Sequence, residues 1–344
     1  MVIECKNYEE ALKIKSIITK RIKKGIFNFF INDNYEKTYL IINGQIDLLT
    51  DEFLHENNIN KVFSSLEKDF FFINNEVINK KIKIGNRIYN PNDNLITIVA
   101  GPCEIEDYES LYETAKELKK IGVSVFRAMP EKPRTSPYNF QGIGDIGWEY
   151  LAKIKEELDI PVLAEVFCEE DINKAKKYNI DLIQIGARNM QNYNLIKKAA
   201  QSKITTVLKK GMWCNNIQLL KAAEYFFVYG NGNVILCERG IQTQENTTRN
   251  TFDISAIKYL KENSSLPIMA DASHGTGIRE YVIPVNTAAV LMGADIIEVE
   301  VHIEPNRTIK PGDFYQMLNI EQYKNLISEL NKINNLKNKR FDFM

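Results

Sequence analysis

From residue 95 onward, short apolar runs alternate with segments of helical spacing, and this alternation constrains the fold more than any other feature. Eight apolar runs occur, at residues 95–100, 123–127, 161–166, 181–185, 205–209, 234–237, 267–270 and 296–301. Helical patterns lie between them, for example at 108–121 and 216–229, and the last lies at about 320–333. Such alternation is typical of a parallel sheet. Since eight units in ~250 residues are what a closed barrel needs, we predict a (β/α)8 TIM barrel over residues 95–344. An open doubly wound sheet would usually carry a Gly-rich fingerprint after its first strand, which is missing here.

The residues before the barrel have a different pattern. Strands are expected at 2–6, 26–31, 38–42 and 61–66, and helices at 8–23 and 47–58. The order β-α-β-β-α-β is that of small ferredoxin-like domains, so residues 1–70 are predicted to form an α+β domain. Residues 71–94 are expected to be a linker, with a hairpin at 82–89 that turns at Gly85-Asn86.

Composition excludes several functional classes. The chain has 44 Lys and Arg against 45 Asp and Glu, a net charge of -1. Nucleic acid and anionic membranes are therefore unlikely main partners. No apolar run approaches the ~18 residues of a membrane span, and the N-terminus does not begin a signal peptide. The five scattered Cys do not indicate a disulfide framework, so a reducing cytoplasm is the expected location.

Basic side chains gather where the predicted strands end. In such barrels the active site lies at the C-terminal ends of the strands, and six cations belong to that rim: Arg127, Lys132, Arg134, Arg188, Lys209 and Arg239. Cations at one mouth indicate an anionic ligand, because guanidinium groups bind phosphate and carboxylate bidentately. Any one of them could instead extend its stem along the surface at a helix start, but a shared bias at four strand ends favours a ligand site.

A second group of rim residues is suited to a metal ion. Cys103 follows strand 1, His274 follows strand 7 and Glu300 lies on strand 8, and barrel closure makes these strands neighbours. Thiolate, imidazole and carboxylate are compatible with Zn, Fe(II) or Mn, and Asp313 could add an oxygen ligand. His55 is expected at the surface. His302 either supports a metal ligand or lines the site, and the other cysteines are expected to be small buried hydrophobes: Cys5, Cys168, Cys214 and Cys237.

Several short motifs together resemble one enzyme family. They are Gly101-Pro102-Cys103, Lys132-Pro133-Arg134-Thr135-Ser136-Pro137, Ile185-Gly186-Ala187-Arg188-Asn189, Leu208-Lys209, Glu238-Arg239-Gly240 and Ser273-His274. From about residue 82 to 330 the chain resembles 3-deoxy-D-arabino-heptulosonate 7-phosphate (DAHP) synthase of the type I beta branch. The resemblance implies a transferase that condenses phosphoenolpyruvate with erythrose 4-phosphate, the first step of the shikimate pathway to aromatic amino acids. It also implies an ACT-type regulatory domain that confers inhibition by tyrosine or phenylalanine, and a tetrameric homo-oligomer.

The resemblance also assigns roles to single residues. It implies Cys103, His274, Glu300 and Asp313 as metal ligands, the last when two residues are inserted upstream. Phosphoenolpyruvate would be held by Arg127, Lys132, Ala187, Arg188, Lys209 and Arg239, and the phosphate of erythrose 4-phosphate by Arg134, Thr135 and Ser136. Candidates for proton transfer are Lys132, Glu165 and His302, where Glu165 positions a water or pairs with a nearby Arg. The stretch Ala128-Met129-Pro130-Glu131 is bulkier than that of many relatives.

Three other functions compete with this interpretation. The cousin 3-deoxy-octulosonate 8-phosphate synthase uses a longer sugar phosphate and usually has Lys-Ala-Asn-Arg-Ser where this chain has Lys132-Pro133-Arg134-Thr135. A non-catalytic sensor of phosphometabolites would need the cations but not a thiolate metal site. A fused chorismate mutase would make residues 1–70 all-helical, against the strand-like run at 26–31.

Overall fold

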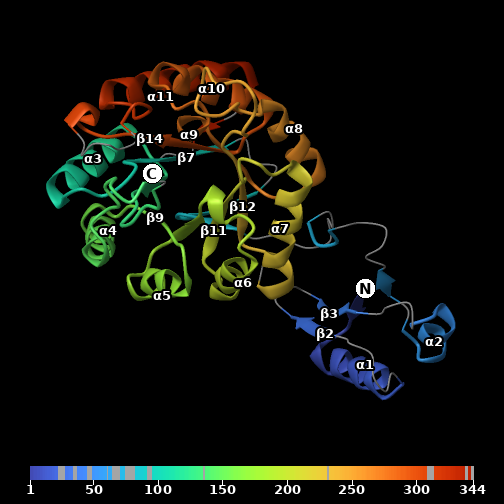
Figure 1. Ribbon diagram of the computed structural model, residues 1–344. Helices are drawn as coiled ribbons and strands as arrows, with labels where there is room; N and C mark the ends of the chain where they lie inside the picture. The colour runs from blue at the N-terminus through green and yellow to red at the C-terminus, as the bar shows by residue number, and fades with distance from the viewer. Residues whose placement is uncertain are drawn as a thin grey trace.

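The computed structural model describes residues 1–21, 28–33, 37–44, 49–59, 61–63, 70–73, 82–90, 95–134, 136–230, 232–307, 314–337 and 340–341. A small antiparallel sheet lies near the N-terminus, and a parallel sheet surrounded by helices forms the rest of the molecule (Figure 1).

The parallel sheet closes on itself. Its strands are β7 (Leu95–Gly101), β8 (Val125–Arg127), β9 (Val162–Glu165), β10 (Leu182–Ile185), β11 (Thr205–Lys209), β12 (Val234–Glu238), β13 (Ile268–Asp271) and β14 (Ile296–Glu300). Each strand pairs with the next along the chain, and β14 pairs with β7 from Ile296 opposite Thr97 to Glu300 opposite Gly101. The strands are buried on both faces, which is why they read as continuous apolar runs. The predicted (β/α)8 barrel is confirmed.

Helices cover the outside of the barrel. They are α3 (Tyr108–Ile121), α4 (Asp145–Leu158), α5 (Glu169–Lys177), α6 (Tyr193–Ser202), α7 (Asn216–Tyr229), α8 (Ile254–Asn263), α10 (Arg279–Met292) and α11 (Ile320–Lys337), with the short α9 (Ala272–Thr276) after β13. The predicted bounds of α3 and α7 are confirmed, because side chains cap their first turns: Asp107 accepts from the Ser110 N–H at 2.7 Å, and Asn215 from that of Gln218 at 2.9 Å. Among the described residues, no helix is long and apolar enough to cross a membrane.

The N-terminal elements form the predicted ferredoxin-like unit. They are β1 (Val2–Cys5), α1 (Tyr8–Arg21), β2 (Asn28–Asn32), β3 (Thr38–Asn43), α2 (Asp51–Glu56) and β4 (Val62–Phe63), and the sheet order is β2-β3-β1-β4. The helix expected at 47–58 begins at residue 51, because the Thr50 hydroxyl accepts from the Phe53 N–H at 3.3 Å and caps the helix there. Parts of the predicted elements, at 22–27, 45–48 and 64–66, lie outside the described residues. The sheet is incompatible with an all-helical chorismate mutase.

The predicted hairpin between the two sheets is also present. Strands β5 (Lys83–Ile84) and β6 (Arg87–Ile88) turn at Gly85, whose φ of +58° favours glycine. The backbone carbonyl of Lys83 accepts from the Thr205 hydroxyl at 2.6 Å, which ties the hairpin to the start of β11. The sequence did not predict β15 (Arg340–Phe341), which pairs in parallel with the start of β7. Two residues are too few to show a strand period.

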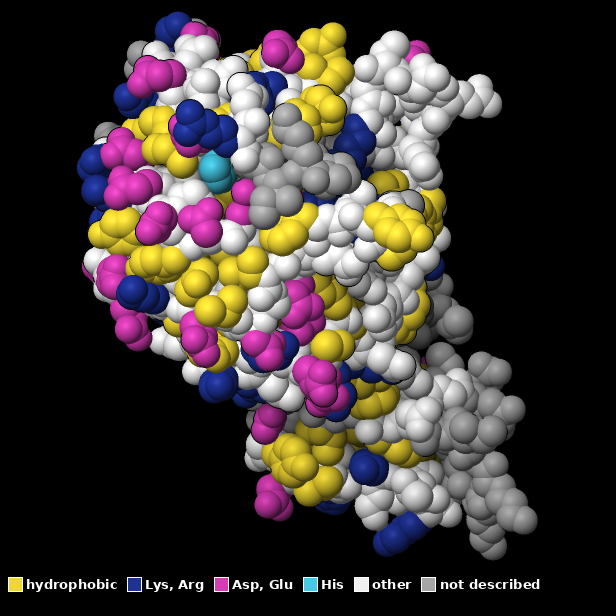
Figure 2. All heavy atoms as spheres, turned by 60° about the vertical axis from the view of Figure 1, so that its left-hand side comes forward, with side chains coloured by type: hydrophobic (Ala, Val, Ile, Leu, Met, Phe, Trp, Pro, Cys, Tyr) yellow, Lys and Arg dark blue, Asp and Glu magenta, His cyan; other side chains and the backbone are white. Residues whose placement is uncertain are grey.

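The small domain packs against α7, beside which it lies in Figure 1. Three consecutive backbone N–H groups, of Phe71, Phe72 and Ile73, donate to the Glu224 carboxylate of α7 at 2.7–3.2 Å. The Asn32 side-chain amide at the end of β2 donates to the carbonyls of Phe227 and, at 3.2 Å, of Gly230. In Figure 2 the small domain forms a separate lower lobe, and acidic and basic side chains are interspersed over the barrel above it.

Candidate active site

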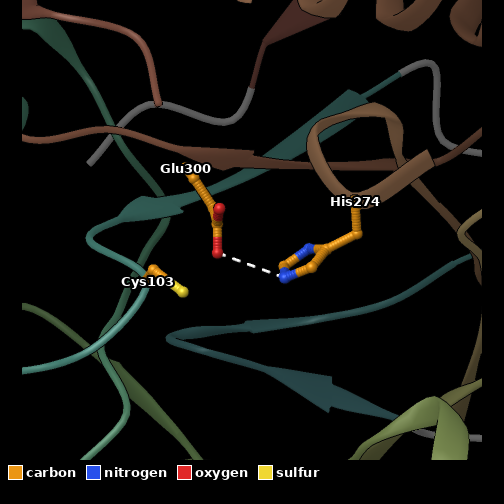
Figure 3. Close-up of side chains that lie close together, drawn as sticks. All are labelled: Cys103, His274 and Glu300. Atoms are coloured by element: carbon orange, nitrogen blue, oxygen red, sulfur yellow. Dashed lines mark ion pairs between the residues drawn. The ribbon is translucent and has the colours of Figure 1, made fainter. Parts of the chain in front are cut away.

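The strand register brings Cys103, His274 and Glu300 together. Glu300 ends β14 directly opposite Gly101 of β7, Cys103 follows two residues later, and His274 lies on α9 just after β13. One donor atom from each residue lies within 4.8 Å of the others, and all three side chains are buried (Figure 3). Gly101 permits the close approach of β7 to β8 beside this cluster, because it has a φ of +150° and a Cβ there would lie 2.0 Å from the Arg127 carbonyl oxygen.

Asp271 sets the orientation of the His274 ring. Its carboxylate accepts from the His274 backbone N–H at 3.0 Å and lies 2.8 Å from Nδ1. In the tautomer that carries its proton on Nδ1, the imidazole donates to this carboxylate, and the lone pair of Nε2 is left for a metal ion. Nε2 lies 3.2 Å from Glu300 Oε1 (Figure 3). Burial lowers the pKa of His274, which favours the neutral imidazole that a metal ion requires.

These donors fit a divalent transition metal. A buried thiol, a neutral imidazole and a carboxylate from three neighbouring elements form the soft and mixed donor set that Zn, Fe(II) and Mn sites use. The Lys132 ammonium contacts Cys103 Sγ and lies 3.5 Å from His274 Nε2 and 3.7 Å from Glu300 Oε1. Asp313, the expected fourth ligand, lies outside the described residues.

An open cavity lies beside this cluster, and His274 is part of its wall. Five cations line it: Lys132, Arg188, Lys209, Arg239 and Arg249. Four of them were predicted from the strand ends, and Ala187 also lines the cavity as predicted. Arg249 was missed, because it lies in the irregular loop after β12, where neither apolar spacing nor a strand end draws attention to it. Burial lowers the pKa of Arg239, and the charge of Arg249 lowers it further.

Glu165 brings a carboxylate into the same cavity. It is 7% exposed, and its Oε2 accepts from the Gln184 side-chain amide at 3.0 Å. Gly186 makes room for it, since a Cβ at that position would lie 2.0 Å from Glu165 Oε1. Burial raises the pKa of Glu165. Within the described part of the chain no arginine forms an ion pair with it, although this pairing was one of the two expected roles.

Other predicted residues lie away from the cavity wall. Arg127 lies in the barrel interior, where its NH1 pairs with Glu298 at 3.1 Å and Glu300 at 3.0 Å. Arg134 pairs with the buried Glu104 and donates from Nε to the Phe140 carbonyl at 3.0 Å. Ser136 is half-buried nearby, and Thr135 lies outside the described residues.

His302 is buried after β14, and among the described residues it belongs neither to the three-donor cluster nor to the wall of the cavity. Its Nδ1 accepts from the Glu304 backbone N–H at 2.9 Å. The ring thereby fixes the loop that leaves the strand. Burial lowers its pKa.

A second group of donor atoms lies deeper in the barrel, at Cys237, Asp271 and Glu298. Here the Lys209 ammonium already stands between the carboxylates, at 2.6 Å from Asp271 and 2.7 Å from Glu298. Burial raises the pKa of the Cys237 thiol well above its usual range, which favours a protonated sulfur. This arrangement is therefore an ion-pair cluster in which lysine supplies the positive charge.

The remaining cysteines follow the prediction with one exception. Cys5, Cys214 and Cys237 are buried as expected, whereas Cys168 is exposed, so the prediction of a buried hydrophobe there was wrong. Cys168 occupies the N-cap position of α5, where the chain turns out from β9 into solvent. His55 is exposed, as expected.

Comparison with known proteins decides the family. A model of the DAHP synthetase I family matches residues 76–337. Phospho-2-dehydro-3-deoxyheptonate aldolase of Thermotoga maritima is 44% identical over 252 residues, which are 73% of this chain and 72% of that protein. The chain belongs to the DAHP synthetase I family. The predicted DAHP synthase, a transferase of aromatic amino acid biosynthesis, is thereby confirmed, and the non-catalytic sensor is set aside.

Other relatives place the chain within a wider group. 2-Dehydro-3-deoxyphosphooctonate aldolase of Desulfosudis oleivorans is 32% identical over 253 residues, 68% of this chain and 89% of that protein. A crystal structure of DAHP synthase from Thermotoga maritima superposes with a TM-score of 0.76 at 35% identity, and the match covers 99% of both chains. A truncated form of that enzyme matches 76% of this chain and 94% of its own, with a TM-score of 0.69. The similarity in fold thus extends over the small domain.

Proposed function

We propose that the cavity beside Cys103, His274 and Glu300 binds phosphoenolpyruvate and erythrose 4-phosphate and that condensation depends on a divalent ion. The observation that carries this proposal is the juxtaposition of five cations with a buried thiol–imidazole–carboxylate set in one open cavity. Guanidinium and ammonium groups are suited to the phosphate and carboxylate of phosphoenolpyruvate. When bound, the ion would be held by these three residues and would polarise the aldehyde as a Lewis acid.

Side chains of this protein then have to donate and accept the protons that the reaction moves. The reaction joins C3 of phosphoenolpyruvate to the aldehyde carbon, adds the oxygen of water to C2, and releases inorganic phosphate by breaking the C2–O bond, which leaves C2 as a ketone. One proton of the water ends on the aldehyde oxygen, and the other leaves with the phosphate. The aldehyde oxygen takes up a proton in this step, and Lys132, next to all three donor residues, is the candidate donor. Glu165 lines the same cavity, and its raised pKa makes it the candidate acceptor of the proton from water.

The sugar phosphate that the enzyme accepts distinguishes DAHP synthase from the alternative, 3-deoxy-octulosonate 8-phosphate synthase. Lys132-Pro133-Arg134-Thr135 and the higher identity to a heptonate than to an octonate aldolase favour the four-carbon aldose. We expect phosphate release from phosphoenolpyruvate with erythrose 4-phosphate at a kcat/KM at least ~100-fold above that with arabinose 5-phosphate, since a site built for one substrate rejects others at about this level. Equal turnover of the two sugars would contradict the assignment.

The small domain is proposed to regulate the barrel. Residues 1–70 are assigned as an ACT-type domain that responds to tyrosine or phenylalanine, residues 71–94 as the linker and residues 95–344 as the catalytic barrel. Asn32 of this domain contacts the carbonyls of Phe227 and Gly230, at α7 and the turn that leads into β12, the strand that ends beside Arg239. Residues 71–73 of the linker contact Glu224 of α7. A shift of the small domain would therefore act on an element connected to the cation cluster. A cytoplasmic homo-oligomer, a tetramer by resemblance, completes the proposal.

A further inference from the structure

A buried carboxylate outside the predicted active-site residues joins two of the proposed phosphoenolpyruvate-binding cations. Glu298 lies on β14, two residues before Glu300, and is 0% exposed. Its Oε1 lies 3.1 Å from NH1 of Arg127 and 2.7 Å from Nζ of Lys209. One oxygen atom thus bridges two cations that come from β8 and β11, on different sides of the barrel.

Burying the Glu298 carboxylate inside the barrel lowers the stability of the fold. Interior positions of barrel strands are usually filled by branched apolar side chains, and a buried charge lowers stability unless it is paired. The second oxygen of Glu298, Oε2, is buried without a hydrogen-bond partner among the described residues, as is Nε of Arg127. A packing role would be served better by valine or leucine, so the position of this charge calls for a functional reason.

Glu298 also connects the cations with the proposed metal ligands. Arg127 bridges Glu298 and Glu300 through NH1, and Lys209 bridges Glu298 and Asp271. Asp271 contacts His274, whose Nε2 returns to Glu300. The six side chains form a closed ring of alternating partners, in which Glu298 is separated from Glu300 by Arg127 and from His274 by Lys209 and Asp271.

The ring restrains Lys209 in particular. Two carboxylates take two of the three protons of its ammonium group, and the side chain lines the cavity. A free lysine side chain loses rotamer entropy when it is fixed, and a side chain that is already fixed does not lose it again on binding a ligand. Burial opposes the charge of Lys209, but Asp271 and Glu298 outweigh it and raise its pKa.

We propose that Glu298, itself held by Arg127, is a positioning residue that fixes Lys209 of the cavity wall in place for phosphoenolpyruvate. This inference rests on the proposed phosphoenolpyruvate site. Glu298 acts through Lys209 and does not touch the substrate, so it affects binding of phosphoenolpyruvate more than the steps that follow.

The test compares Glu298→Gln, which keeps the shape and removes the charge, with Glu298→Asp, which keeps the charge. We expect Glu298→Gln to raise the KM and the calorimetric Kd for phosphoenolpyruvate about tenfold, the size of a lost hydrogen bond to a charged group, with kcat changed less than threefold. Glu298→Asp should recover part of that affinity. Asp295→Asn is the matched control, because Asp295 is another buried carboxylate paired with a lysine, Lys261 at 2.9 Å, just before the same strand. It should lower the unfolding temperature without changing the Kd.

Two results would overturn the inference. An unchanged Kd in both Glu298 variants would show that the ring does not position the cations, and tighter binding in Glu298→Gln would show that Glu298 only repels the anionic substrate. The variant Lys209→Met shows whether the proposed role of Glu298 is wrong or the proposed phosphoenolpyruvate site is wrong. If Lys209→Met weakens phosphoenolpyruvate binding while Glu298→Gln does not, the proposed binding site is supported and the proposed role of Glu298 is contradicted. If Lys209→Met also binds normally, the proposed site itself is wrong.

Discussion

At the scale of single residues, the carboxylate of Asp271 acts on two side chains: it orients the imidazole of His274 and it favours the charged form of Lys209. One oxygen accepts from the His274 backbone N–H, and the other lies 2.8 Å from His274 Nδ1 and 2.6 Å from Lys209 Nζ. Burial alone would raise the pKa of Asp271, but His274 and Lys209 outweigh it and hold the pKa well below its usual range. The carboxylate therefore stays ionised, orients the imidazole and keeps the lysine charged.

Cys5 gives a prediction about pH. Burial, followed by the charge of Glu10, raises the pKa of this β1 thiol from an ordinary 9.0 to about 11. Because the folded pKa lies above the unfolded one, the stability that Cys5 contributes is complete below pH 9 and is lost as the pH rises toward 11. We expect the free energy of unfolding to fall more steeply between these pH values in the wild type than in Cys5→Ala, as measured by urea unfolding.

Alkylation of the same thiol provides an independent check. At pH 8 the exposed Cys168 should react with iodoacetamide well before the buried Cys5, and mass spectrometry of the peptides would give the two rates. Equal rates, or identical pH slopes in the wild type and Cys5→Ala, would contradict the burial of Cys5.

At the scale of elements, α7 is where the small domain meets the barrel. Glu224 accepts three backbone N–H groups from residues 71–73, and Phe72 stacks on Phe227 with ring centroids 6.2 Å apart. Glu224→Ala would leave these donors without their acceptor. We expect a loss of about 1–3 kcal/mol in the free energy of unfolding and faster limited proteolysis between residues 60 and 95.

Glu262→Ala on α8 is the control for this change. Glu262 is exposed, and its one ion pair among the described residues is with Lys258 of the same helix, at 3.2 Å, so its loss should change stability by less than about 0.5 kcal/mol. If the two variants were equally stable and equally resistant to protease, the Glu224 contact would not hold the domains together.

The helices and strands were predictable from the sequence where buried residues recur with a fixed period or in continuous apolar runs. The barrel strands appear in the sequence as apolar runs, since parallel strands are covered on both faces, and α3 and α7 have side-chain caps at their starts. The position of Cys103 next to Glu300 followed from the closure of the barrel alone.

What could not be predicted depends on contacts between distant segments. The role of Asp271 requires knowing that Lys209, 62 positions earlier, reaches across the barrel interior. Arg249 lies in an irregular loop, and Cys168 was misjudged because one residue at a helix cap has no periodic pattern around it. The sequence shows which residue types reach the rim but not which partners they find there.

At the scale of the whole molecule, the two domains are expected to divide catalysis and regulation. A structure of a truncated form of DAHP synthase from Thermotoga maritima matches 76% of this chain. We expect deletion of residues 1–70 to leave kcat for DAHP formation within about threefold, because the described residues that line the cavity all belong to the barrel. Inhibition by tyrosine or phenylalanine should disappear. A truncated enzyme that is still inhibited, or a full-length enzyme insensitive to both amino acids, would contradict the regulatory assignment.

The central claim is that three buried donors and a cluster of cations act together in one cavity, and phosphate release from phosphoenolpyruvate with erythrose 4-phosphate tests it most directly. The assay is run on the full chain as purified, after exhaustive chelation, and after addition of Mn²⁺, Fe²⁺ or Zn²⁺. We expect turnover to fall to background on chelation and to return with at least one of these ions. Undiminished turnover by a chelated enzyme in which metal analysis detects no ion would contradict the account.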